Sequence, residues 1–127
     1  MNKNVESTGE EVLSEIDEAN RLVALATSFG LQETAEMALI RRRLVTAFKG
    51  KEDLEETRRL YQHYEDLAMA TVVQNGDVQV QIGLLLLKAA LYVEAGDVSA
   101  YDEHLYDAML DAHNADLPEL VKLIRGE

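Results

Sequence analysis

The chain of 127 residues contains no cysteine, no tryptophan and only one proline. Without cysteine, the chain cannot form disulfide bonds, use thiol catalysis or hold a cysteine-ligated zinc or iron–sulfur centre. The scarcity of proline and aromatic residues, with abundant Ala, Leu and Glu, favours helix over strand, because straight-chain side chains lose little rotamer freedom in a helix. We therefore expect a single all-helical domain over residues 9–127, preceded by a flexible tail over residues 1–8.

Long hydrophobic runs are also missing. The most apolar stretch, residues 82–93, is shorter than the roughly 20 residues that a membrane-spanning helix needs, and Lys88 interrupts it. The first nine residues are polar and do not resemble a secretory signal. We therefore expect a cytoplasmic protein in which residues 82–93 belong to a buried helix.

Positive charge is scarce, since 12 Lys and Arg stand against 24 Asp and Glu, which gives a formal net charge of −12. This charge repels phosphate backbones and anionic lipids, so we expect neither nucleic acid nor membrane as a direct partner. Most of the basic residues gather in one stretch, where seven of them outnumber four carboxylates. This basic island contains Arg41, Arg42, Arg43, Lys49, Lys51, Arg58 and Arg59.

Four glycines each follow an apolar run of helical period: Gly30, Gly50, Gly76 and Gly96. Glycine adopts the left-handed conformation that ends a helix at no steric cost, so the four positions predict four helix ends. The first helix is expected over about residues 9–28. Asp97 is expected to cap a fifth helix, and Asp116 a short sixth helix with Pro118 in its first turn.

The segment 78–95 is apolar nearly all round from Ile82 onward, which a surface helix cannot be. We therefore predict an all-α fold of five to six antiparallel helices, arranged as helical hairpins around this central apolar helix. Either a bundle or a short stack of hairpins satisfies the pattern.

Residues 85–112 resemble a single tetratricopeptide-type hairpin. The matching positions are Leu85, Ala89, Tyr92, Gly96, Leu105 and Ala108. The stretch departs from that family at Tyr101, where alanine is usual, and at His113, where proline is usual. No second copy follows at a 34-residue step. The resemblance implies a protein-binding helical stack that carries no chemistry of its own.

Each of the three histidines has an aspartate three residues further on, and residues at this spacing are neighbours on a helix. Such pairs could ligate a metal or orient a base, and they are His63 with Asp66, His104 with Asp107, and His113 with Asp116. The alternative is a set of solvated pairs, because carboxylates are common in this chain and no His-Glu-x-x-His motif occurs. We predict no catalytic and no cofactor-binding residue, and we keep a metal-dependent enzyme as a third hypothesis.

The candidates for partner binding are Arg41, Arg42 and Arg43, whose guanidinium groups suit carboxylates, and Tyr106, the tyrosine expected to be exposed. Arg41 has an internal alternative, in which it pairs with acidic faces of neighbouring helices. Tyr61, Tyr64 and Tyr92 are expected to face the core with their hydroxyl groups at its rim.

Our first hypothesis is a non-catalytic protein–protein interaction module or small adaptor that could also self-associate. The second is an acidic inhibitor of the immunity type that covers a basic surface.

Overall fold

The computed structural model describes the backbone of residues 3–51, 54–75 and 78–126, and the side chains of residues 14–51, 54–70 and 78–126. The described residues form six helices and no strand, which confirms the all-helical class. The helices are α1 (Lys3–Ser28), α2 (Ala35–Gly50), α3 (Leu54–Asn75), α4 (Val78–Glu94), α5 (Val98–Asn114) and α6 (Pro118–Arg125).

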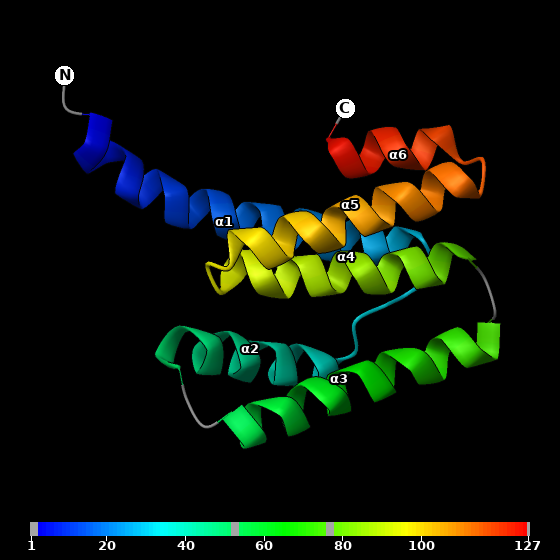
Figure 1. Cartoon of the computed structure of the whole chain (residues 1–127), viewed down its shortest axis with the longest axis horizontal. Coiled ribbons are helices and arrows are strands. Elements are labelled where there is room, and N and C mark those ends of the chain that lie inside the picture. The colour runs from blue at the N-terminus through cyan, green and yellow to red at the C-terminus, as the bar shows by residue number, and fades with distance from the viewer. Residues whose placement is uncertain (1–2, 52–53, 76–77, 127) are drawn as a thin grey trace.

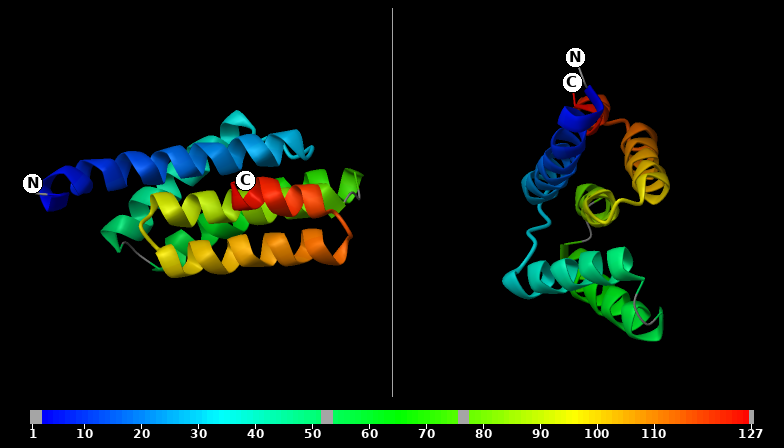
Figure 2. Two further views of the ribbon diagram at one scale, coloured as in Figure 1. Left: turned by 90° about the horizontal axis from the view of Figure 1, so that it is seen from above. Right: turned by 90° about the vertical axis from the view of Figure 1, so that its left-hand side faces the viewer.

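Helix α4 is the centre of the fold, as its apolar composition predicts. It runs antiparallel to α1 and α5, which contact it from two sides, while the α2–α3 hairpin contacts it from a third (Figures 1 and 2). Helix α6 folds back along α5 and also contacts α1. The arrangement is therefore one of antiparallel helices around a shared apolar helix.

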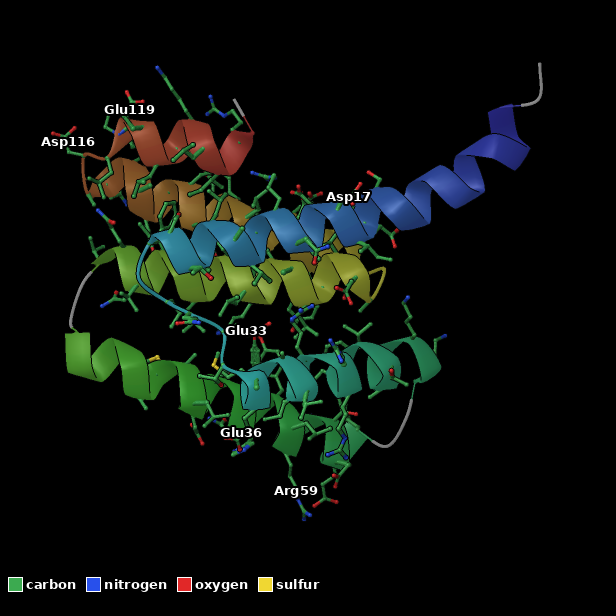
Figure 3. The ribbon with its side chains drawn as sticks, turned by 180° about the vertical axis from the view of Figure 1, so that it is seen from behind. Asp17, Glu33, Glu36, Arg59, Asp116 and Glu119 are labelled. Carbon is green, nitrogen blue, oxygen red and sulfur yellow. The ribbon has the colours of Figure 1, made fainter. Side chains whose placement is uncertain are left out.

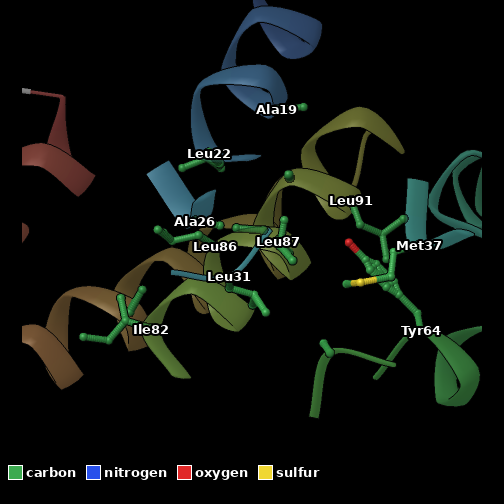
Figure 4. Packing of buried hydrophobic residues seen from close by; sticks show 14 of the residues in the cluster. Ala19, Leu22, Ala26, Leu31, Met37, Tyr64, Ile82, Leu86, Leu87 and Leu91 are labelled. Atoms are coloured by element: carbon green, nitrogen blue, oxygen red, sulfur yellow. The ribbon is translucent and has the colours of Figure 1, made fainter. Parts of the chain in front are cut away.

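The core forms where side chains of four helices meet α4. Leu86, Leu87 and Leu91 of α4 are fully buried or nearly so, and Figure 4 shows Leu91 beside Met37 of α2 and Tyr64 of α3. One side of α4 is only half-buried, and Leu84, Leu85 and Lys88 lie on it. Nζ of Lys88 donates to Oε2 of Glu65 on α3 at 3.1 Å. The helix is thus central without being covered evenly.

Gly83 permits the closest approach to α4. A Cβ atom at this position would lie 3.1 Å from the Cβ of Leu31, in the segment that joins α1 to α2. That segment can therefore lie against α4 and bury Leu31 completely. The periodicity of the sequence does not single out Gly83.

Two of the glycines take the predicted left-handed conformation. Gly30 and Gly96 have φ angles of 101° and 83°, in the left-handed region. Gly50 is different, because it is the last residue of α2 and Lys51 takes the left-handed position after it. Gly76 lies outside the described residues. The left-handed position is therefore right for Gly30 and Gly96, and the end of α2 at Gly50 is confirmed although Lys51 takes the left-handed position there.

Three helix starts can be compared with the sequence. Asp97 caps α5 as expected, since its Oδ1 accepts a hydrogen bond from the backbone N–H of Ala100 at 3.1 Å. Asp116 does not cap α6: it adopts a left-handed φ of 59° after α5, and Leu117 occupies the cap position before Pro118. Helix α1 begins at Lys3, earlier than the expected start near Gly9.

None of the helices in the described residues combines the length and apolar character needed to cross a bilayer.

Candidate binding groove

Two adjoining open clefts form where the α2–α3 hairpin meets the turn between α4 and α5. Their volumes are about 610 and 370 Å³, within the range of ligand-binding clefts. They share four lining residues, and we call the combined cleft the aromatic groove. The shared residues are Phe48, Leu54, Thr57 and Tyr92.

A stack of rings forms the wall of the aromatic groove. The rings of Phe48 and Tyr92 are parallel, with an interplanar angle of 2° and 5.7 Å between centroids. Tyr92 also stacks on His104 at 5.1 Å and contacts Tyr61 at 6.2 Å. The Nζ atom of Lys88 lies 5.9 Å from the centroid of Tyr61. Phe48, Tyr61 and Tyr92 of α2, α3 and α4 line the groove, and His104 of α5 stacks on Tyr92 without lining either cleft.

Leu54 stands at the mouth of the groove. It begins α3, and 66% of its surface is exposed although it lines both clefts. Burial of a leucine side chain that was exposed to water is favourable by about 1.5–3 kcal/mol of free energy. Leu54 therefore adds apolar surface to the groove that a bound partner can cover.

Basic side chains surround the groove. Lys51 and Arg58 line it, and a third cleft of about 270 Å³ adjoins it and is lined by Arg42 and Arg43. We call these four residues the basic rim. Within the described part of the chain, none of the four forms an ion pair.

Among the described residues that line the three clefts, the carboxylates are Glu56 and Asp97, so basic side chains outnumber acidic ones by four to two there. Asp97 already accepts the capping hydrogen bond at the start of α5. In a chain whose formal net charge is −12, this is a local reversal of sign. Charges of one sign along a cleft attract ligands of the opposite sign.

Arg41, the third arginine of the run, lies inside the fold. Only 9% of its surface is exposed, and its guanidinium binds both oxygens of Glu33, with Nε–Oε2 at 2.9 Å and Nη2–Oε1 at 3.3 Å. Its Nη1 donates to Oε1 of Glu94 at 2.9 Å. This is the internal arrangement that the sequence left open, and Arg41 is thereby separated from Arg42 and Arg43.

The Arg41 cluster ties four parts of the chain together. Tyr64 of α3 donates its hydroxyl hydrogen to Oε2 of Glu33 at 2.6 Å, so α2, α3, α4 and the α1–α2 connection meet there. Burial, together with the negative charge of Glu33, raises the pKa of Tyr64 far above its ordinary value. Burial acts to lower the pKa of Arg41, but its bonds to Glu33 and Glu94 outweigh burial and raise it.

The histidine–aspartate pairs acquire other partners. His63 Nε2 lies 3.3 Å from Oε1 of Glu36 on α2, and Oδ1 of Asp66 accepts from Gln62 at 2.9 Å. His104 Nδ1 lies 2.8 Å from the backbone oxygen of Ala100. Asp107, His113 and Asp116 are exposed. Among the described residues, no three His, Asp or Glu side chains gather in a way that could hold a metal ion.

Tyr64 and Tyr106 lie as the sequence predicts, whereas Tyr92 faces the aromatic groove and not the core. Tyr64 is buried with its hydroxyl on Glu33, and Tyr61 and Tyr92 are half-buried in the wall of the groove. Tyr106 is the exposed tyrosine, with 61% of its surface accessible on α5. It lies outside the aromatic groove, so the four partner-binding candidates occupy three different places.

Sequence reasoning did not find the aromatic groove. Phe48 and Tyr92 lie on different hairpins, and no local spacing connects them. The sequence does contain one signal that could have pointed to the groove. Phe48 shortly precedes Gly50, within the basic island, and Tyr92 shortly precedes Gly96. The sequence identified the charge of this region, but the ring wall is a product of tertiary packing.

Comparison of the chain with protein-family models, with curated proteins and with solved structures yields no match. The class that the structure defines is an all-helical bundle of antiparallel hairpins with a basic-rimmed aromatic groove. The α4–α5 hairpin occupies the stretch that resembles a tetratricopeptide unit, and that relation stays a resemblance.

Proposed function

We propose that this protein is a non-catalytic protein-binding module and that the aromatic groove receives an acidic amphipathic segment of its partner. The observation that carries the proposal is the combination of an open ring-lined groove with four basic side chains that form no ion pair among the described residues. The chain elsewhere is strongly acidic, so this charge is concentrated at the groove.

The chemistry of the groove favours this class of partner. Aromatic rings offer large contact areas with little loss of conformational entropy, and tyrosine is common where binding energy concentrates. Arginine guanidinium groups bind carboxylates through two parallel hydrogen bonds. In a segment with aliphatic side chains on one face and carboxylates beside them, the aliphatic side chains can pack on the aromatic wall and the carboxylates can bind the basic rim.

A selection from a displayed library of random helical peptides tests the proposal on the full chain. We expect clones that bind the wild-type protein and lose at least about tenfold in affinity on the Leu54→Glu variant, a change of about 1.4 kcal/mol. The matched control is Leu39→Glu, because Leu39 is similarly exposed, at 60%, and lies on α2 outside every cleft described above. Circular dichroism checks that both variants fold.

Failure of the selection has a clear form. If no bound peptide distinguishes Leu54→Glu from Leu39→Glu, the groove is not a binding site and the proposal is wrong. Peptides whose affinity is unchanged by both leucine substitutions and lowered by Tyr106→Ala would instead place the binding site on α5.

The acidic-inhibitor hypothesis rests on that face of α5. Tyr106 and Leu110 are both exposed and lie four residues apart, which places them on one side of the helix. Exposed carboxylates flank them, at Asp102, Glu103, Asp107 and Asp111. Basic peptides that depend on Tyr106 in the same selection would support this second function.

A further inference from the structure

Helix α1 is longer than its companions and extends beyond them. It spans Lys3–Ser28, and its N-terminal part continues past the turn between α4 and α5 (Figures 1 and 2). Figure 3 shows Asp17 on α1 close to the level of that turn. We call residues 3–17 the α1 arm.

The α1 arm and the aromatic groove lie at the same end of the molecule. The groove is built from the C-terminal end of α2, the N-terminal end of α3 and the α4–α5 turn. Figure 1 shows these three places on the same side as the beginning of α1. Two copies that meet with these ends facing each other would bring each arm toward the other copy's groove.

The α1 arm has the composition that the groove favours. It contains one lysine and five carboxylates, a formal charge of −4. Val5, Val12 and Ile16 are seven and four residues apart, a spacing that places them on one face of a helix. Ile16, whose side chain the structure describes, is 42% exposed.

The arm is held away from its own groove. At its base, Glu18 binds Arg21 and accepts the hydroxyl hydrogen of Tyr101 on α5. Arg21 also donates to the backbone oxygens of Leu123 and Ile124 at the end of α6, at 2.9 and 3.0 Å. These contacts fix the direction of α1 as it leaves the bundle, so the arm can reach a groove only on another molecule.

We propose that the α1 arm of one copy occupies the aromatic groove of a second copy, and that the exchange is reciprocal and forms a two-fold dimer. The proposal rests on the proposed function, because the arm is a particular case of the acidic segment that the groove is expected to bind. A reciprocal contact of this kind closes on itself, so it gives a dimer and not a filament.

Sedimentation equilibrium of the full chain tests the exchange. We expect a monomer–dimer equilibrium at about 0.15 M salt, where a Debye length of about 8 Å screens the long-range repulsion between two chains of net charge −12 more than the close pairing of arm and rim. Arg58→Glu on the rim and Glu11→Arg on the arm should each weaken dimer formation. Glu103→Arg, which makes the same charge change on the exposed face of α5, should not.

Mixing the two weakened variants gives the sharpest result. In the mixed dimer the wild-type arm meets a wild-type groove, and the reversed arm meets a reversed groove. The mixture should therefore form dimers better than either variant alone. A dimer that only Tyr106→Ala disrupts would overturn the proposal.

A chain that stays monomeric up to about millimolar concentration would also overturn the arm exchange, since this exceeds the dissociation constant of even a weak complex. That outcome is distinct from failure of the proposed function. Groove-dependent peptides in the display selection would still show a binding site whose partner is another protein.

Discussion

At the scale of single residues, neighbouring side chains of one type have different roles. Arg41 is buried in a cluster with Glu33 and Glu94, whereas Arg42 and Arg43 are exposed beside the groove. The sequence offered an internal position for Arg41 as an alternative but could not decide for it, because the carboxylates that bind Arg41 come from distant elements. A buried ion cluster also makes its members sensitive to the loss of one partner.

Replacement of Arg41 by alanine should strongly destabilise the fold. Glu33 and Glu94 would keep their negative charges without the guanidinium, and removal of one partner of a buried pair costs about 3–5 kcal/mol. Urea unfolding followed by circular dichroism measures the free energy of unfolding. The matched control is Arg42→Ala, which should change it by less than about 0.5 kcal/mol. Equal effects of the two substitutions would contradict the structural role given to Arg41.

At the scale of helices, the sequence predicted the elements well and their contacts only in part. The segment 78–95 indicated the central helix because a helix that is apolar nearly all round must be largely buried. Asp97 indicated a helix start because its side chain can cap locally. The prediction that Asp116 caps α6 was wrong, because a polar residue shortly before Pro118 can either cap the next helix or follow the end of the previous one. The groove and the Arg41 cluster depend on contacts between hairpins, which local patterns do not contain.

The contact between α1 and α5 should depend on pH through Glu18. Burial acts to raise the pKa of Glu18, but hydrogen bonds from Arg21 and Tyr101 outweigh burial and hold the pKa below its ordinary value. The carboxylate is therefore favoured in the folded chain. Its contribution to stability is present above the ordinary pKa of about 4.3 and is lost as the pH falls through the lower, folded-state value.

We accordingly expect Glu18→Gln to lower the free energy of unfolding near neutral pH and to lose this effect in strong acid, at about pH 2–3. Urea unfolding across this pH range measures the difference from wild type. Asp17→Asn is the control, because Asp17 is the exposed neighbour on the same helix. A difference for Glu18→Gln that persists unchanged into acid would show that its carboxylate contributes no charge-dependent stability.

At the scale of the whole molecule, charge and shape are distributed unevenly. A chain with a net charge of −12 places its basic rim beside an aromatic groove at one end, and an acidic helical arm begins at that same end. The distribution supports recognition of one protein segment by another, and we infer no chemistry from it.

Amide chemical-shift mapping of the 127-residue chain tests whether the aromatic groove binds an acidic helical segment. The probe is a synthetic peptide of residues 3–17, added to protein dilute enough to be monomeric. We expect shift changes concentrated around Phe48, Leu54, Thr57 and Tyr92, and much weaker changes with the Arg58→Glu variant. Shift changes centred on Tyr106, or no change at a large excess of peptide, would contradict the assignment of the aromatic groove as the site that binds an acidic helical segment.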